Sequence, residues 1–446
     1  MNKLAPIAAV LCGLLFNLNA HAAGEQDVQN SFNPYNKGFP QFPGLKPGLV
    51  INKANLEQFK AVLDPGLQYV IENEWHQIKV GATTQFLINP QFIEMTQQHL
   101  NKTKLGQRTG DIENYISGRP FVEEPDLKDP RAGEKLAWNF RAGAGIGDSG
   151  VIYPFYWRYR DLMSGKIEKT VKFSFNILKF KHRIDEPSPE IKPNPADLTA
   201  AIYAKVFEPQ DLKNTQLLIL HADDDHKPQD AYMYLGFQRR VRRMAPGQYT
   251  DAFLGSDVMI EDFEGFNGRI SDMKWTYKGA QNLLLPMFNH REMKLATDLP
   301  IEKDGYQFID VNGQGGCFPD ITWQLRKTYV LEVEPLEAKH PISRSLFYLD
   351  AQSMHIVRTL IYDRKGQLWK VGTLGKTHPD THLPENKDLG SPVDDIFSAV
   401  DVQTKHCTTG QFKAKVDHKA NPVSLFQVQN LRGRDRKSTR LNSSHT

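Results

Sequence analysis

One short segment has the residue types of a catalytic nucleophile. Gly147-Asp148-Ser149-Gly150 is similar to the nucleophile segment of trypsin-like proteases, in which a histidine oriented by a carboxylate activates the serine. Val151 and Ile152 stand where those proteases have glycine and proline, and no upstream Ala-Ala-His-Cys segment supplies the histidine. A turn after a glycine-rich loop explains the segment better, so we expect no catalytic residues.

Two further segments have the composition of cofactor or metal sites. Gly143 to Gly147 has glycines at every second position, but the third falls too early for a dinucleotide loop and no βαβ unit surrounds it. The run from His221 to His226 holds three aspartates and two histidines, which are suitable ligands for a divalent metal. The run has neither the spacing of an EF-hand nor that of a zinc site, and its composition predicts a solvated turn. We therefore expect neither a metal nor a cofactor.

The most informative run extends from Ala231 to Met244. Its apolar and polar residues alternate with a period of two, which predicts one long strand over 232–244, bent at Gly236. The apolar face holds Met233, Leu235 and Phe237, and the opposite face holds Arg240 and Arg242.

The arginines of this run admit two interpretations. They pair with aspartates and glutamates of neighbouring strands, or Arg240 and Arg242 hold an anionic head group at the rim of a cavity, where a guanidinium fork suits carboxylate or phosphate. A nucleic-acid patch is excluded, because alternation splits the arginines between two faces.

A second strand, Thr170 to Lys181, places Val171, Phe173 and Phe175 on one face. If it neighbours the long strand, these residues and Met233, Leu235 and Phe237 line one side of a curved sheet. That side is either a filled core or a hollow that binds a hydrophobic ligand.

The remaining segments predict mainly β structure with a few helices. We expect a helix from Asn52 to Asp64, one or two helices within 67–100, an exposed connection over 100–135, strands from Trp138 onward, a long ordered loop over 245–275 and a covering segment over 281–295. Further strands are expected at 202–207, 216–220, 329–334, 344–349, 355–362 and 367–371, with a tight turn at 363–366.

We predict that the two ends of the sequence are not part of the folded domain. Residues 1–22 have the charge, apolar run and Ala20-His-Ala22 site of a secretory signal peptide. Residues 435–446 read as a translated sequencing adaptor rather than natural sequence. The formal net charge of +3 falls to about zero without Lys3 and that tail, so the charge indicates neither nucleic acid nor an anionic membrane as a partner.

Two cysteines, Cys317 and Cys407, remain after the signal peptide. In an oxidising compartment they pair, closing a loop of about 90 residues that stabilises the fold by ~4–5 kcal/mol in the chain-entropy model. Two buried thiols are the other interpretation, since sequence does not show proximity.

Several segments together are similar to those of one exported protein family of Gram-negative bacteria. They are Ala231–Met244, Gly255-Ser-Asp, Asp262-Phe-Glu-Gly-Phe-Asn267, Tyr329-Val-Leu-Glu-Val-Glu, Phe347-Tyr-Leu-Asp and Tyr362-Asp-Arg-Lys-Gly-Gln-Leu-Trp369. The resemblance covers roughly residues 45–433. The family has no agreed activity and is labelled outer membrane lipoprotein-sorting protein, which implies a fold like the lipoprotein carriers LolA and LolB, a half-open β-barrel covered by helices and long loops.

These observations predict an α+β protein with a large curved antiparallel sheet, in which residues 23–135 pack on a β-rich domain at 136–434. The first functional hypothesis is a periplasmic carrier or chaperone for a lipid or acylated protein, which the resemblance places beside an inner-membrane exporter or an outer-membrane barrel. The alternatives are an accessory subunit with a filled core and a hydrolase.

Overall fold

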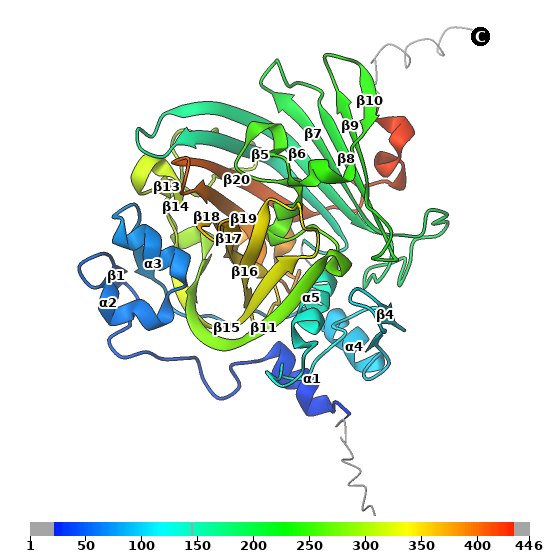
Figure 1. Ribbon diagram of the computed structural model, residues 1–446, viewed down its shortest axis with the longest axis horizontal. Helices are drawn as coiled ribbons and strands as arrows, with labels where there is room; N and C mark the ends of the chain where they lie inside the picture. The colour runs from blue at the N-terminus through cyan, green and yellow to red at the C-terminus, as the bar shows by residue number, and fades with distance from the viewer. Residues whose placement is uncertain (1–21, 144–145, 432–446) are drawn as a thin grey trace, which may run out of the picture.

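The computed structural model describes residues 22–143 and 146–431. The predicted signal peptide up to residue 21 and the C-terminal tail lie outside these ranges. One sixteen-stranded sheet dominates the structure and curves without closing into a barrel (Figure 1). This confirms the predicted α+β class with a large curved sheet.

Almost every pair of neighbours in the sheet is antiparallel. The exceptions are β15 with β2 and β12 with β18. In spatial order the strands are β1 (Val50–Ile51), β2 (Ile78–Val80), β15 (Thr322–Pro335), β16 (Ile342–Asp350), β17 (Ile356–Asp363), β18 (Leu368–Thr377), β19 (Val393–Asp401), β20 (His406–Val416), β5 (Ser149–Asp161), β6 (Ile167–Lys179), β7 (Leu198–Glu208), β8 (Gln216–Ala222), β9 (Asp230–Leu235) and β10 (Arg240–Arg243). Two more strands join from the side, β11 (Met273–Leu285) on β15 and β12 (Met287–Phe288) on β18.

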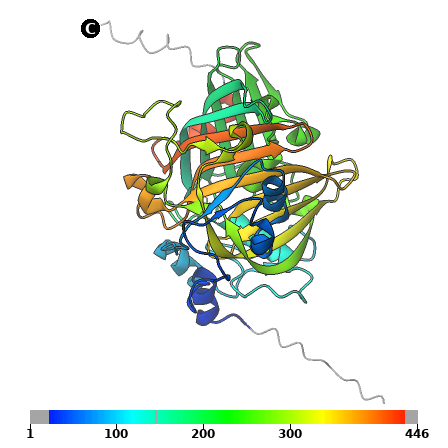
Figure 2. The same ribbon diagram turned by 90° about the vertical axis from the view of Figure 1, so that its left-hand side faces the viewer.

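The outer face of the sheet is covered by the N-terminal segment. Val330 of β15, Leu360 of β17 and Val371 of β18 share a core with this segment. Figure 2 shows α2 and α3, in blue, in front of these strands. The helices of the segment are α1 (Glu25–Phe32), α2 (Leu56–Phe59), α3 (Pro65–Glu72) and α4 (Pro90–Gln98), with the 3₁₀ turn η1 (Lys60–Val62).

The inner face is covered by helix α5 (Ala132–Ala142) and by residues 245–272, which we call the cover. The cover is a series of 3₁₀ turns rather than a helix, and Phe253 and Phe263 share a core with β5 and β6. Helix α5 packs on β11 and β15 through a separate core that includes Trp138. The turns of the cover are η2 (Pro246–Thr250), η3 (Phe253–Gly255), η4 (Ile260–Gly265) and η5 (Ile270–Asp272).

Smaller elements complete the described chain. They are the ribbons β3 (Lys104–Leu105) with β4 (Ile112–Glu113) and β13 (Val311–Asn312) with β14 (Phe318–Pro319), helix α6 (Pro379–His382), and the 3₁₀ turns η6 (His290–Glu292), η7 (Gln314–Gly316), η8 (Pro384–Asn386), η9 (Val423–Phe426) and η10 (Val428–Asn430).

The predicted single strand over 232–244 is wrong, because the chain reverses after Leu235. β9 and β10 form a hairpin in which Arg240 lies opposite Leu235 and Arg242 opposite Met233. Residues directly opposite each other in an antiparallel pair share a face of the sheet. The hairpin therefore brings Arg240 and Arg242 to the face of Met233, whereas one continuous strand would have separated them.

Two other expectations need correction. Residues 281–285 belong to the long strand β11 rather than to a covering segment, and Trp138 lies in α5 rather than in a strand. The helix predicted to end at Asp64 is present as α2 and η1 and ends at Val62. Asp64 also begins the next helix, α3, since its carboxylate accepts a hydrogen bond from the backbone N–H of Leu67 at 2.9 Å. The predicted strand at 170–181, the hairpin at 202–220 and the turn at 363–366 are confirmed.

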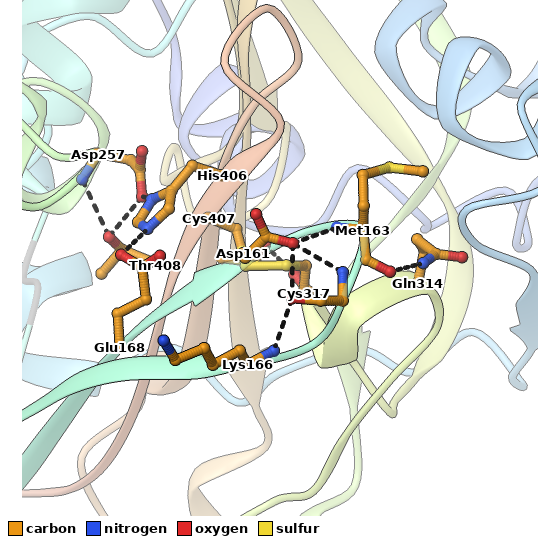
Figure 3. Close-up of a disulfide and its surroundings, with 12 residues drawn as sticks. Asp161, Met163, Lys166, Glu168, Asp257, Gln314, Cys317, His406, Cys407 and Thr408 are labelled. Atoms are coloured by element: carbon orange, nitrogen blue, oxygen red, sulfur yellow. Dashed lines mark hydrogen bonds and ion pairs between the residues drawn. A yellow bond between two sulfur atoms is a disulfide. The ribbon is translucent and has the colours of Figure 1, made fainter.

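Cys317 and Cys407 form a disulfide (Figure 3). Their Cα atoms are 5.9 Å apart, and the bond joins the excursion between β12 and β15 to strand β20. Beside Cys407 in Figure 3, the imidazole of His406 contacts the Asp257 carboxylate at 2.8 Å. The disulfide thus lies next to the attachment of the cover to the sheet.

We expect the Cys317→Ser, Cys407→Ser double variant to lose roughly 4 kcal/mol of unfolding free energy. The two cysteines are 90 residues apart in the sequence, and closing so long a loop removes much entropy from the unfolded chain. Urea denaturation of oxidised protein measures the difference. A reducing agent should lower the wild-type midpoint to that of the variant and leave the variant unchanged; a loss below about 1 kcal/mol contradicts the prediction.

Candidate ligand-binding site

An apolar cavity lies between the inner face of the sheet and the cover. Its volume is about 100 Å³. The strands supply most of its wall and the cover closes it through Val258 and Phe263. The apolar residues of the sheet that line it are Ile152, Phe155, Trp157, Phe175, Ile361, Leu374, Phe397, Ala399 and Phe412.

Aromatic rings in this wall contact one another mainly edge to face. The ring centroids of Trp157 and Phe397 are 5.3 Å apart, and those of Phe175 and Phe263 are 5.4 Å apart. Such pairs add about 0.5–1.5 kcal/mol each beyond the burial of their area. Because Phe263 comes from the cover, the cover supplies part of the apolar core on the inner face of the sheet.

A second cavity of about 140 Å³ adjoins the first. Helix α5 and strands β6, β7 and β8 supply much of its wall, and its lining is more polar. Glu264 and Asp394 line both cavities. The interior therefore has an apolar part and a polar part that meet at two carboxylates.

Each cation in the wall of the second cavity has an acidic partner. The guanidinium of Arg141 lies 3.5 Å from Asp225, Lys181 lies 2.8 Å from Asp223, and Lys179 lies 3.6 Å from Asp148. Lys376 pairs with Asp394. Pairing of this kind offsets the loss of hydration that charged groups suffer in the interior.

Glu264 differs from these residues because its carboxylate forms no ion pair or hydrogen bond with any described residue. It sits in the cover at a φ of 56°, a left-handed conformation that is uncommon outside glycine. Glu264 is an exposed residue that lines both cavities, but loss of hydration between the cover and the sheet, together with the nearby Asp394 carboxylate, raises the pKa of its carboxyl to about 7, although Lys376 and Lys179 act in the opposite direction. The protein thus holds an unpaired acid at the junction of the two cavities.

The cover is attached to the sheet by polar contacts at one side. The Thr408 hydroxyl donates to the Asp257 carboxylate at 2.7 Å, and the Lys370 ammonium donates to the Asp257 carbonyl at 2.6 Å. The imidazole of His340 contacts Glu261 at 2.9 Å. These bonds set the position from which Phe263 and Glu264 enter the interior.

The predicted site residues of β6 all lie on the inner face. Phe175 lines the apolar cavity, while Val171 and Phe173 belong to the apolar core of the same face without lining the cavity. Met233 of β9 packs against the edge of that core. β7 and β8 separate β6 from β9, so the two predicted faces are parts of one surface but not neighbouring strands.

The other predicted residues lie at the β9–β10 turn and beyond it. Leu235 is half-buried, and Phe237 is 71% exposed at the turn. Arg240 and Arg242 are exposed and line neither interior cavity. Arg243 pairs with Asp230, whereas Arg240 and Arg242 have no acidic partner among the described residues.

The weaker sequence candidates have ordinary structural partners. The Ser149 hydroxyl donates to the carbonyl of Asp417 at 3.1 Å and accepts from the Asn421 amide. His221 and His226 contact different residues, Gln229 and Asp111. In the part of the chain that the structure describes, no group of three or more histidine, cysteine, aspartate or glutamate side chains is arranged to hold a metal ion.

Several lining residues were missed by sequence reasoning. Phe263 and Glu264 lie in a segment read only as a loop, and Trp138 was assigned to a strand. The one available signal was the pair of phenylalanines around Glu264 in Asp262-Phe-Glu-Gly-Phe266, since apolar rings in a glycine-rich loop need a surface to cover.

Comparison with known proteins identifies the family. Residues 50–432 match the family model described as a protein of unknown function, DUF1329. The chain belongs to this family. The uncharacterized protein PA3922 of Pseudomonas aeruginosa is similar, with 23% identity over 82% of this chain and 79% of its own length.

Solved structures similar to this DUF1329 protein include three bacterial proteins. A DUF1329 family protein of Desulfovibrio piger is 16% identical, with a TM-score of 0.47 over 68% of this chain and all of its own. A Vibrio parahaemolyticus domain described as an outer membrane lipoprotein-sorting protein is 15% identical, with a TM-score of 0.45 over 67% of this chain and 97% of its own. A LolA superfamily protein of Nitrosomonas europaea is 10% identical, with a TM-score of 0.39 over 67% and 98%.

Within residues 22–143 and 146–431, no helix is long and apolar enough to cross a bilayer.

We expect Glu264→Gln to stabilise the protein at pH 8. The folded protein binds a proton at Glu264 with a pKa of about 7, against 4.5 as the ordinary value. The folded state therefore holds more protons than the unfolded state between these pH values, and its stability decreases as pH rises through this window. The uncharged amide removes that penalty.

Urea midpoints of both proteins from pH 5 to pH 8 test this expectation. The variant should exceed the wild type at pH 8, and the difference should shrink as pH falls towards 5. A difference that does not depend on pH contradicts it.

Proposed function

We propose that this protein is a non-enzymatic carrier that binds a hydrophobic molecule, such as a lipid or the acyl group of a lipoprotein, between its curved sheet and the cover. The apolar cavity carries the proposal, because it lies on the inner face of an open sheet and aromatic and aliphatic side chains form most of its wall. Pockets of this kind are the common form of sites for apolar ligands.

Burial of an acyl chain supplies the binding energy without covalent chemistry. Each methylene transferred from water contributes about 0.8 kcal/mol. A ligand of ten or more carbons is thus captured with useful affinity even after the losses of motion that binding imposes.

The cover has to move for a long chain to enter. The apolar cavity of about 100 Å³ is smaller than the engineered cavity of roughly 150 Å³ that accepts benzene in another protein. Phe253 and Phe263 occupy space that an acyl chain would take. Leu254 and Glu264 of the cover have left-handed backbone conformations, which store strain that displacement of the cover would release.

The proposal places the carrier in the periplasm, beside an inner-membrane exporter or an outer-membrane barrel that supplies or receives the ligand. The disulfide between Cys317 and Cys407 supports an oxidising compartment. The alternative, an accessory subunit with a filled interior, differs in that it binds no apolar molecule.

We expect purified protein to bind the apolar fluorescent probe N-phenyl-1-naphthylamine, and we expect Ala399→Phe to weaken that binding at least tenfold. Ala399 lines the apolar cavity from β19, so a phenyl ring there fills the space. Fluorescence titration measures affinity, and mass spectrometry of solvent extracts shows whether a lipid is released.

Ala338→Phe, the same substitution at an exposed position, is the control and should bind like the wild type. The urea midpoint of Ala399→Phe shows whether the variant is folded, since overpacking costs about 1–3 kcal/mol. Absence of probe binding by the folded wild type contradicts the carrier function and favours the accessory subunit.

We also propose that Arg240 and Arg242 contact anionic head groups at the membrane that supplies the ligand. Both are exposed on the terminal strand of the sheet, on the face of Met233, and Phe237 projects from the adjoining turn. An exposed aromatic ring beside unpaired arginines suits the interface of an anionic bilayer.

We expect Arg240→Gln, Arg242→Gln to weaken binding to phosphatidylglycerol vesicles by roughly 10- to 30-fold, because each arginine near such a surface contributes about 1 kcal/mol. Vesicle flotation at low salt measures the effect. The control Lys46→Gln, Lys365→Gln removes two exposed charges, one in the N-terminal segment on the outer face and one in the β17–β18 turn, and should bind normally. Equal losses in both variants contradict a specific role for Arg240 and Arg242.

A further inference from the structure

The walls of the two cavities contain buried polar atoms without hydrogen-bond partners. The indole N–H of Trp138, the indole N–H of Trp157 and both ring nitrogens of His355 have none in the described part of the chain. These side chains are 6%, 3% and 5% exposed. Most buried polar groups in proteins are paired. These four nitrogen atoms are closed off in the free protein, so a ligand reaches them only when the surrounding side chains or the cover shift.

These atoms come from three separate elements that converge on the interior. Trp138 of α5 and His355, which precedes β17, line the polar cavity, and Trp157 of β5 lines the apolar one. Glu264, also without a partner, lines both. A molecule spanning the two cavities therefore meets hydrogen-bond donors and one acceptor carboxylate along its polar part.

The charges in these walls disfavour an anionic ligand. The cations Arg141, Lys179, Lys181 and Lys376 already have acidic partners. Lys370, in the wall of the apolar cavity, donates to the backbone carbonyl of Asp257 and forms no ion pair with a described residue. The same wall carries four carboxylates, those of Asp257, Asp262, Glu264 and Asp394. One ammonium among four carboxylates leaves the surroundings net negative, which disfavours a carboxylate or phosphate ligand.

A cationic head suits the interior only in part. An ammonium pairs with Glu264, but it has no lone pair to accept from the indole N–H groups of Trp138 and Trp157. A hydroxyl group both donates and accepts, so it meets the carboxylate and the N–H donors together.

We propose that the interior selects an uncharged amphiphile whose hydroxyl-bearing head donates to Glu264 and accepts from Trp138 and His355, while its tail lies in the apolar cavity against Trp157 and Phe175. This inference rests on the proposed carrier function and specifies the ligand of the same site.

Three probes with one twelve-carbon chain length test the head group. They are 1-monolauroylglycerol, which bears hydroxyls, laurate, which is anionic, and dodecylamine, which is cationic. Each competes with N-phenyl-1-naphthylamine for the wild-type protein. We expect the glycerol ester to bind at least tenfold more tightly than either charged probe. Preference for laurate or dodecylamine overturns the proposal.

Substitution of the donors provides the second part of the test. Trp138→Phe removes an N–H that has no partner in the free protein, so the urea midpoint should not fall. Its affinity for 1-monolauroylglycerol should fall roughly 5- to 20-fold, the effect of one hydrogen bond, while its affinity for laurate stays unchanged. An unchanged affinity for the glycerol ester overturns the proposal, and points to water as the partner of this N–H group.

Trp275→Phe is the matched control. The indole N–H of Trp275 donates to the carbonyl of Ile270 at 2.9 Å, and Trp275 lines neither cavity. This variant should lose stability and keep the wild-type preference among the probes.

Failure of the carrier function and failure of the head-group preference give different results. If the naphthylamine probe does not bind, the carrier function fails and the head-group inference fails with it. If that probe binds and all three twelve-carbon competitors displace it equally, the carrier function stands and only the head-group inference is wrong.

Discussion

The alternation of side chains along the long strands places apolar groups on both faces of one sheet, and each face needs its own cover. The N-terminal segment packs on the outer face, through Val330, Leu360 and Val371. The inner face is closed by α5 and by the cover, which are drawn from residues 132–142 and 245–272 (Figure 1). The N-terminal segment packs helices on a continuous core, whereas residues 245–272, which cover β5 and β6 beside α5, are short 3₁₀ turns. We therefore place the proposed ligand on the inner face.

The polar part of the interior depends on the same arrangement. Lys179, at the end of β6, and Lys376 of β18 both line the polar cavity and are paired with Asp148 and Asp394. Glu264 lies in the cover, and its carboxylate has no ion-pair or hydrogen-bond partner among the described residues. Displacement of the cover would therefore move an unpaired acid and two phenylalanines, Phe253 and Phe263, together. A ligand that displaces the rings and also pairs with Glu264 would offset part of the free energy lost by moving the cover.

Sequence reasoning succeeded where a period of two was uninterrupted. The alternation of Val171, Phe173 and Phe175 predicted both the strand and the face that β6 presents to the interior. It failed at the β9–β10 turn, because Gly236-Phe-Gln-Arg239 lacks the Asn-Gly or Asp-Gly pair that marks most two-residue hairpins. Arg239 adopts a φ of 51° in that turn. An arginine gives no signal of such a left-handed conformation in the sequence. Apolar and polar residues keep alternating in the sequence across the turn, although the chain reverses direction there.

The cavity was harder to predict than the sheet. Trp138, Trp157 and His355 are far apart in the sequence, and each reads as an ordinary core residue within its own element. Their shared property, a ring nitrogen without a partner, exists only after the strands are assembled. Glu264 likewise reads as a loop acid until the cover is folded onto the inner face.

The order of pairing in the sheet has a consequence for incomplete chains. β5 lies between β6, which follows it directly, and β20, which begins at His406. β15 similarly pairs with β2, β11 and β16 at different points along its length. A chain interrupted before residue 406 leaves one edge of β5 open, with the aromatic residues Phe155 and Trp157 beside it. Open edges of this kind recruit strands from other molecules, so fragments released by early termination or proteolysis would gain an additional edge through which to self-associate.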